Sequence, residues 1–399
     1  MSMMRKHKAC APAGPRRLRK AALAFAVLLP LLLLACAACG SGQEGGVSAG
    51  QESAGQQGSG VAESAGQQTG ADVVVPRQDT GGDRRLENIA QWDDGGQGIG
   101  LPAKLTLGTG GTGGTYYPYG SAAAAALMGQ IEGLDVTVLA TGASQANLYA
   151  LADGSIDMAI AQNDVMDYAA KGTALFVEAL GGFSAVAGLY PEPCQIVARP
   201  GTGSVEGLRG KNVSIGEIGS GVSFNAVEIL EAYGMSVLDV KVYHLGYSES
   251  ALAYMDGAID AFFCVAGAPT AAVAVLAPLR DFELLEISSE HADRLIGRYP
   301  FYTRYTIAGG TYEGIGEDVE TVAVKAALVA SDRLGGDLVY AMTKALFACK
   351  GEIAAAHSKG AFLDPAYATE GISIPFHPGA LRYYEEAGVQ IWAPDMTQP

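Results

Sequence analysis

Residues 104–120 form a glycine- and threonine-rich segment with the composition of an anion-binding loop. The segment reads Lys-Leu-Thr-Leu-Gly-Thr-Gly-Gly-Thr-Gly-Gly-Thr-Tyr-Tyr-Pro-Tyr-Gly. It begins as a short alternating strand and ends where an alanine-rich helix starts near Pro118. A loop that joins a strand to a helix N-terminus presents several free backbone N–H groups to one point. The segment therefore predicts a site for a small anion.

Three ligand classes compete for this loop. The spacing Gly108-x-Gly110-x-x-Gly113 fits the dinucleotide fingerprint, but the next predicted strand, 136–140, is followed by Thr-Gly-Ala-Ser and lacks the acid that binds ribose. The phosphate-binding P-loop pattern fails because Gly114 stands where its lysine should be. The third class is a carboxylate held by backbone amides, hydroxyls and aromatic rings. A flexible glycine-rich loop without a ligand is the remaining interpretation.

Residues 1–35 have the pattern of a lipoprotein signal peptide. Seven basic residues precede an apolar run at 21–35, which is short for a membrane span. The run ends Leu-Leu-Ala-Cys, which resembles a lipobox and predicts lipidation of Cys36, with Cys39 as the alternative. Ordinary secretion, with both cysteines there by chance, stays open. Loss of residues 1–35 removes seven positive and no negative charges, so the net charge changes from −16 to −23.

Such an acidic mature chain excludes non-specific binding to nucleic acid, which needs a basic face. It also disfavours adhesion to anionic lipid, so we expect the membrane link to be the covalent lipid anchor.

Residues 36–100 are rich in Gly, Ser and Gln, and Glu52-Ser-Ala-Gly-Gln-Gln recurs eleven residues later from Glu63. This composition predicts a disordered linker that tethers a folded domain.

Cysteine and histidine are sparse and scattered. Cys194, Cys264 and Cys349 have no metal-binding spacing, so we expect them in the core, with a disulfide left open. We predict no metal and no cofactor. No histidine lies beside a nucleophile pattern at a predicted strand end, so we predict that the protein is not an enzyme.

From residue 101 onward, strands and helices alternate, which predicts an α/β architecture with a mainly parallel sheet. The predicted strands are 105–107, 136–140, 158–161, 212–215, 240–243 and 259–265, and the predicted helices are 119–131, 145–153, 164–170, 223–233, 248–256 and 269–276.

This alternation occurs twice. Each half has a glycine-rich helix start, after residues 113 and 219, and an Asp-Gly-x-Ile-Asp turn that ends at Asp157 or Asp260. We interpret both aspartates as structural. The repeat predicts two lobes that close a cleft on a small anion. Lobe 1 is predicted to comprise 101–198 and 309–399, and lobe 2 to comprise 199–308.

Nine short motifs in order along the folded part resemble the solute-binding subunits of tripartite ATP-independent periplasmic (TRAP) transporters, of the TAXI subfamily. Taken singly each motif is weak, but together they span about 280 residues. They are Gly110-Gly-Thr-Gly-Gly-Thr-Tyr-Tyr-Pro, Gly154-Ser-Ile-Asp-Met-Ala-Ile-Ala-Gln-Asn, Leu189-Tyr-Pro-Glu-Pro, Leu208-Arg-Gly-Lys, residues 216–221, Gly257-Ala-Ile-Asp-Ala-Phe-Phe, Gly267-Ala-Pro-Thr, Thr321-Val-Ala-Val and His377-Pro-Gly-Ala.

The resemblance implies the two-lobe fold of class II periplasmic binding proteins. It further implies an extracytoplasmic receptor that delivers a small carboxylate, such as glutamate, to TRAP permease subunits in the membrane. The alternatives from other classes are an enzyme or sensor domain on the same fold, and a surface adhesin.

The predicted ligand-binding residues follow the helix starts and strand ends of both lobes. Gln162 and Asn163 could instead cap a helix, and the same holds for the serines of the second lobe. Arg199 is left out because no motif supports it, and Glu192 is expected in a turn between the lobes. The predicted set is Gly114, Thr115, Tyr116, Tyr117, Thr141, Ser144, Asn147, Gln162, Asn163, Ser220, Gly221, Ser223, Gly267 and Pro269.

Overall fold

The structure is a computed structural model, and it describes residues 101–174 and 176–391. The signal peptide, Cys36, Cys39 and the segment up to residue 100 lie outside the described residues, so what the sequence predicts for them stays a prediction.

The first half of the folded part alternates strands and helices as predicted. Strand β1 lies between β2 and β3 and is parallel to both. Every element lies within three residues of its predicted place. In chain order they are β1 (Ala103–Gly108), α1 (Tyr116–Gln130), β2 (Leu134–Leu139), α2 (Ser144–Ala152), β3 (Met158–Gln162) and α3 (Asn163–Lys171).

The second half repeats this arrangement, which confirms the repeat seen in the sequence. Strand β5 lies between β6 and β7, again in parallel. These elements also lie within three residues of the prediction. They are β5 (Asn212–Ser214), α4 (Gly221–Ala232), β6 (Lys241–Tyr243), α5 (Tyr247–Met255), β7 (Ala261–Val265) and α6 (Ala271–Leu276).

The two repeated aspartates have the same structural role, as predicted. The Asp157 carboxylate accepts a hydrogen bond from the Thr106 amide at 2.9 Å, and Asp260 accepts one from the Asn212 amide at 2.8 Å. Each aspartate thus ties the turn before the third strand of its repeat to the first strand.

Two long strands, β4 (Phe183–Ala198) and β10 (Val319–Ser331), join the repeats into one sheet. They run antiparallel to each other, and β10 also pairs with β3. The last five residues of β4 pair with β7. The strand order is therefore β2-β1-β3-β10-β4-β7-β5-β6, with β8 (Glu283–Leu284) on β4 and β9 (Thr303–Ile307) on β10.

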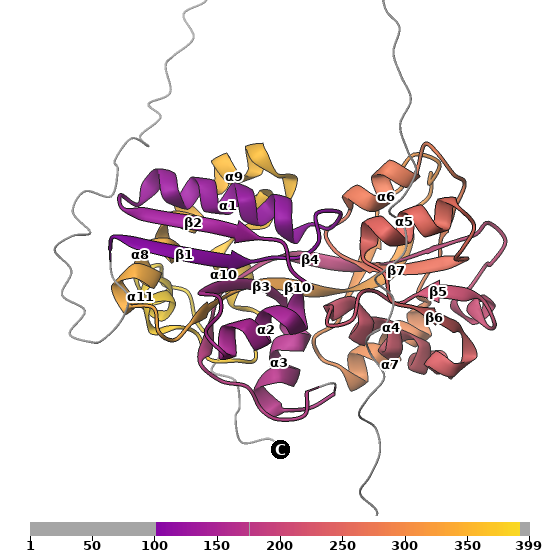
Figure 1. Ribbon diagram of the computed structural model, residues 1–399, viewed down its shortest axis with the longest axis horizontal. Coiled ribbons are helices and arrows are strands. Elements are labelled where there is room, and N and C mark those ends of the chain that lie inside the picture. The colour runs from indigo at the N-terminus through magenta and orange to yellow at the C-terminus, as the bar shows by residue number, and fades with distance from the viewer. Residues whose placement is uncertain (1–100, 175, 392–399) are drawn as a thin grey trace, which may run out of the picture. The chain divides into compact units, whose positions relative to one another are not determined.

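Apolar side chains form separate cores on the two sides of this junction. One core holds the first repeat together with C-terminal helices α8 (Gly336–Ala348), α9 (Lys350–Ala356), α10 (Pro365–Thr369) and α11 (Pro378–Glu386). Two others cover the two faces of the second repeat's strands, one with α4 and α7 (Ser289–Arg298) and one with α5 and α6. Figure 1 shows these two helix pairs on opposite faces of the strands. The chain thus has a mixed α/β fold with two lobes.

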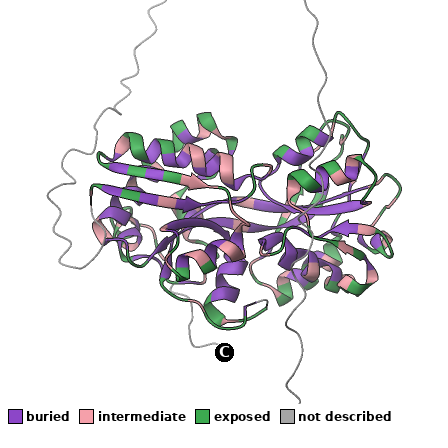
Figure 2. Cartoon of the chain, viewed as in Figure 1, coloured by how far each residue is buried: buried purple, intermediate pink, exposed green. Residues whose placement is uncertain are grey.

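The strands at the centre of both lobes are buried, whereas the outer faces of the helices are exposed (Figure 2). Residues of β4 and β10 belong to the cores of both lobes, which makes these strands the connection between them. The predicted division of the chain at residues 198 and 309 stays a prediction.

Within the described residues, Cys194, Cys264 and Cys349 are free thiols and buried. In the same part of the chain, no group of three or more His, Cys, Asp or Glu side chains could hold a metal ion. None of the helices described is long and apolar enough to span a bilayer.

Candidate functional site

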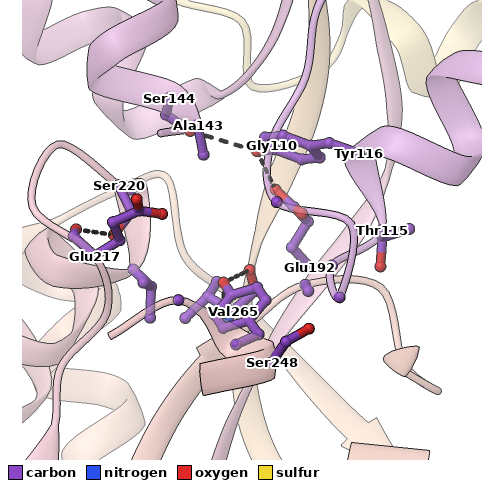
Figure 3. A pocket seen from close by; sticks show the side chains of 18 of the residues that line it. Gly110, Thr115, Tyr116, Ala143, Ser144, Glu192, Glu217, Ser220, Ser248 and Val265 are labelled. Carbon is purple, nitrogen blue, oxygen red and sulfur yellow. Dashed lines mark hydrogen bonds between the residues drawn. The ribbon is translucent and has the colours of Figure 1, made fainter. Parts of the chain in front are cut away.

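A cavity of about 210 Å³ lies between the two lobes. Strand ends and helix starts of both repeats line it, together with one residue of β4 (Figure 3). Its volume is below the roughly 300–1,000 Å³ of pockets for drug-sized molecules, so it suits a small metabolite. The lining residues are Gly110, Gly111, Thr112, Gly113, Gly114, Thr115, Tyr116, Ala143, Ser144, Gln162, Glu192, Glu217, Ser220, Gly221, Val222, Gly246, Tyr247, Ser248, Glu249, Val265 and Ala266.

Half of the residues predicted to bind a ligand line this cavity. They come from three helix starts and one strand end, in both lobes. They are Gly114, Thr115, Tyr116, Ser144, Gln162, Ser220 and Gly221. The structure therefore brings together residues that are up to 107 positions apart in the sequence, counted from Gly114 to Gly221.

Helices α1 and α4 start at the cavity, one from each lobe, and no side chain caps either of them. The Thr115 hydroxyl, at the start of α1, donates instead to the Gly267 carbonyl at 3.1 Å. The Ser220 hydroxyl, at the start of α4, donates to the Glu217 carbonyl at 2.6 Å. The first N–H groups of a helix have no partner within it and carry partial positive charge. Two such helix starts at one cavity offer it N–H donors of the kind that bind anions.

The start of α2 contributes less, because its amides are already used. The Gly219 carbonyl of the second lobe accepts hydrogen bonds from the Gln145 and Ala146 amides at 3.1 and 3.2 Å. This contact draws the loop before α4 against the first lobe. The lobes therefore touch beside the cavity.

The glycine-rich loop also touches the second lobe. A Cβ atom on Gly113 would lie only 2.2 Å from the Ser248 hydroxyl, and one on Gly114 would lie 3.3 Å from the Tyr247 ring. Both partners belong to the first turn of α5. The Gly113 carbonyl also accepts a hydrogen bond from the Ala272 amide in α6 at 3.1 Å. Glycine at these positions thus permits close approach of the lobes.

A chain of polar side chains crosses the first-lobe wall. The Tyr116 hydroxyl donates to the Glu192 carboxylate at 2.8 Å and lies 3.5 Å from the Ser144 hydroxyl. The Ser144 hydroxyl in turn accepts a hydrogen bond from the backbone N–H of Gln162 at 3.1 Å. Figure 3 shows Glu192, Tyr116 and Ser144 in this order. The chain fixes Tyr116 so that it faces the cavity.

Glu192 is 1% exposed, and its removal from water raises the pKa of its carboxyl well above the usual range. The hydrogen bond from Tyr116 opposes that rise, as does the charge of Lys359 in the 3-10 turn Ser358–Phe362. Lys359 does not line the cavity, and its ammonium group donates to the Ala268 carbonyl.

The charged side chains among the described lining residues are all acidic. They are Glu192, Glu217 and Glu249, and none of these lining residues is lysine, arginine or histidine. Attraction for an anion therefore comes from backbone N–H groups, while the side chains supply negative charge and hydrogen-bond acceptors.

A second polar network joins helix α3 of the first lobe to α4 of the second. Asn225 donates to the Asp164 carboxylate at 2.8 Å, and Tyr168 donates to the Glu228 carboxylate at 2.6 Å. Tyr302 donates to Glu228 as well, at 2.6 Å. Burial raises the pKa of the Asp164 carboxyl, and the nearby Glu228 charge adds to the rise. Two carboxyl groups thus lie in the contact between the lobes.

Four of the predicted residues that do not line the cavity bind the protein itself. Asn147 donates to the Thr109 and Ile160 carbonyls at 2.7 and 2.9 Å, and accepts from Thr141 at 2.7 Å. These bonds hold the ends of β1 and β3 together. Asn163 donates to the Gly371 carbonyl at 3.0 Å, and the Ser223 hydroxyl donates to the Ser220 carbonyl at 2.8 Å.

The other three predicted residues do not line the cavity. Tyr117 is half-buried in the first turn of α1. Gly267 and Pro269 follow β7, whereas Val265 and Ala266, immediately before them, line the cavity. Arg199, left out of the predicted set, stacks on the Tyr254 ring at 3.9 Å and donates to backbone carbonyls.

Several lining residues were not among those predicted from the sequence. Glu192 was expected in a turn, but it lies inside the long strand β4. Tyr247, Ser248 and Glu249 begin α5, whose start carries a single glycine, Gly246, in place of a glycine-rich loop. The signal that could have found them is positional, since α5 follows the strand of the second repeat that corresponds to β2, and helices after such strands begin at the cleft.

The fold is similar to those of several solved structures, all at low sequence identity. The alkanesulfonate-binding protein SsuA from Xanthomonas axonopodis pv. citri, bound to MOPS, is 17% identical with a TM-score of 0.44, over 72% of this chain and 85% of that one. The periplasmic aliphatic sulphonate binding protein SsuA from Escherichia coli is 15% identical with a TM-score of 0.43, over 71% and 83%. A putative L-cystine ABC transporter protein from Listeria monocytogenes is 14% identical with a TM-score of 0.40, over 64% and 94%.

A family match covers most of the folded part. Residues 107–388 match the NMT1-like family, a stretch that begins in β1 and ends just after α11. It includes all of the two repeats except residues 103–106 of β1, both connecting strands and every residue that lines the cavity. The chain belongs to the NMT1-like family.

Proposed function

We propose that this protein is an extracytoplasmic solute receptor that captures a small carboxylate, glutamate-like or another organic acid, in the cavity between its lobes. The observation that carries this proposal is the convergence of two uncapped helix N-termini, those of α1 and α4, on one small cavity. Backbone amides at helix starts bind carboxylates by hydrogen bonds and by the helix dipole.

The position of the cavity supports a receptor that closes on its ligand. Each lobe supplies one of the two helix starts, so a ligand bound to both stabilises the closed arrangement. Strands β4 and β10 are shared by the two cores and are the natural hinge. Hinge closure around a ligand is a common motion of two-lobe binding proteins.

We further propose that the receptor delivers its ligand to a TRAP-type secondary transporter, as a member of the TAXI group. The support is the resemblance of nine sequence motifs, from Gly110 to Ala380. A lipid on Cys36, or alternatively Cys39, would keep the receptor at the membrane beside its permease. Uptake of the ligand into vesicles that contain both receptor and permease, driven by an imposed ion gradient, tests this part of the proposal.

Ligand binding is tested by calorimetry on the chain without residues 1–35. The titrants are two- to six-carbon carboxylates, each paired with its uncharged amide. We expect one acid per chain, with at least tenfold weaker binding of the matching amide, because a lost charge-assisted hydrogen bond costs about 1.5–3 kcal/mol. Equal affinity for an acid and its amide would contradict the proposal, as would chemical conversion of a bound acid.

A further inference from the structure

Gln162 presents a hydrogen-bond acceptor that no described residue uses. The side chain ends strand β3, lines the cavity and is 2% exposed. Its Oε1 atom is buried and has no hydrogen-bond partner among the described residues. Buried polar atoms in native proteins are nearly always paired, so an acceptor of this kind at a binding cavity indicates a donor on the ligand.

Neighbouring residues fix the orientation of the Gln162 side-chain amide. Asn225 in α4 donates through its Nδ2 atom to the Asp164 carboxylate and to the Tyr302 hydroxyl, both at 2.8 Å. The Oδ1 atom of Asn225 therefore points the other way, where it accepts a hydrogen bond from Gln162 Nε2 at 3.1 Å. A reversed Gln162 amide would place its oxygen against the Asn225 oxygen. Oε1 is thus the atom left for the ligand.

The surroundings of Oε1 belong to the same part of the cavity as the anion site. A Cβ atom on Gly221, the first residue of α4, would lie 1.7 Å from Gln162 Oε1 and 2.9 Å from the Ser144 hydroxyl. The free acceptor thus lies beside a helix start that offers N–H donors. A ligand that satisfies both must carry an acidic group and a hydrogen-bond donor close together.

The charge of the lining favours the same kind of ligand. Glu192, Glu217 and Glu249 are its acidic side chains among the described residues, and because burial raises the pKa of Glu192, the negative charge comes from Glu217 and Glu249. A plain dicarboxylate would meet these groups with negative charge only. A ligand with an ammonium group next to its carboxylate brings compensating positive charge.

We propose that Gln162 determines specificity by accepting a hydrogen bond from an α-ammonium or α-hydroxyl group, so that the cleft selects amino and hydroxy acids over oxo acids. This inference rests on the proposed carboxylate-binding function. Gln162 acts by direct contact with the ligand, through Oε1. The preference comes from the penalty of leaving this buried acceptor unpaired when an oxo acid is bound.

Three ligands with the same five-carbon skeleton test the inference by calorimetry on the chain without residues 1–35. They are L-glutamate, 2-hydroxyglutarate and 2-oxoglutarate. We expect the dissociation constants of the first two to be at least about tenfold lower than that of 2-oxoglutarate. Tighter or equal binding of 2-oxoglutarate would overturn the inference and leave the carboxylate receptor intact. If none of the three binds, the result counts against both the role of Gln162 and the carboxylate-binding function, as far as five-carbon acids are concerned.

Two variants at Gln162 separate its acceptor from its shape. Gln162→Met keeps a similar length without the acceptor, and it should weaken L-glutamate about tenfold while changing 2-oxoglutarate less than about twofold. Gln162→Glu keeps an acceptor for the ligand but loses the N–H that donates to Asn225 Oδ1, so it should weaken both ligands and still retain the preference for L-glutamate over 2-oxoglutarate. Circular dichroism melting confirms that both variants fold. An equal loss of both ligands in Gln162→Met would show that the residue only packs between the lobes, and would overturn the inference.

Discussion

The substitution Gly221→Ala should block closure of the cleft while leaving each lobe folded. Gly221 is the first residue of α4, in the second lobe, and faces Gln162 and Ser144 of the first lobe. The added methyl group would lie 1.7 Å from Gln162 Oε1, whereas real Cβ contacts essentially never fall below 3.0 Å. The lobes or the Gln162 side chain must therefore move by at least the difference, 1.3 Å.

Neither movement is without cost in the closed state. Displacement of Gln162 breaks its hydrogen bond to Asn225, which is worth about 1 kcal/mol. Separation of the lobes instead weakens the contacts of a ligand with both helix starts. Overpacking of a filled site typically costs about 1–3 kcal/mol. We expect a total loss of roughly 1.5–3 kcal/mol in binding, which corresponds to about a ten- to hundredfold rise in the dissociation constant.

Calorimetry with L-glutamate as the probe measures the change in affinity. Gly336→Ala is a matched control, because Gly336 is also the first residue of its helix, α8, and a Cβ atom there meets nothing within 4 Å. Thermal unfolding without ligand should be nearly the same for both variants, because the open lobes do not bring the new methyl group against Gln162. Wild-type affinity in Gly221→Ala would refute the idea that the closed contact at Gly221 is part of the bound state.

Three further predictions concern other parts of the chain. Burial raises the pKa of Asp164 in the folded protein above its unfolded value of about 3.9, so its stabilising contribution is complete below pH 4 and is lost as the pH rises through the raised pKa. Asp164→Asn should remove about 1–3 kcal/mol of this pH dependence, as measured by urea unfolding between pH 4 and 9, and an unchanged slope would contradict the assignment. Cys36→Ala should abolish lipid attachment in a membrane fractionation, whereas retained lipid would assign the anchor to Cys39. A chain that starts at Leu101 should bind L-glutamate as tightly as the longer chain, and a large loss would place residues before Leu101 in the fold.

The alternating elements could be predicted because local pattern decides them. In both repeats a short apolar strand is followed by a helix whose apolar residues recur at helical spacing. Both kinds of element can be assigned from neighbouring residues alone. Strand β4 could not be predicted in the same way, because it contains Pro191 and Pro193, which normally argue against a strand. The structure pairs this part of β4 with β10, while its pairing with β7 begins only at Cys194. A strand that lacks a hydrogen-bonded partner along one edge tolerates proline on that edge. Only the tertiary structure shows that this part of β4 has such an edge.

The candidate site could be predicted in part, for a related reason. Glycine-rich helix starts are visible in sequence, and they led to Gly114 and Gly221. Short polar residues at strand ends are ambiguous, because the same side chain can bind a ligand or a nearby carbonyl. Asn147 binds carbonyls, whereas Gln162 lines the cavity, and no local pattern distinguishes them. Glu192 was missed because its position depends on β4 crossing from one lobe to the other.

The central claim is that the cavity between the lobes holds a small carboxylate. Mass spectrometry of the small molecules that are released when the purified chain is denatured tests this claim most directly, with Gly221→Ala purified in parallel. We predict an organic acid at about one molecule per wild-type chain, and much less from Gly221→Ala. A molecule without a carboxylate group in that amount, lost from Gly221→Ala in the same way, would contradict the account.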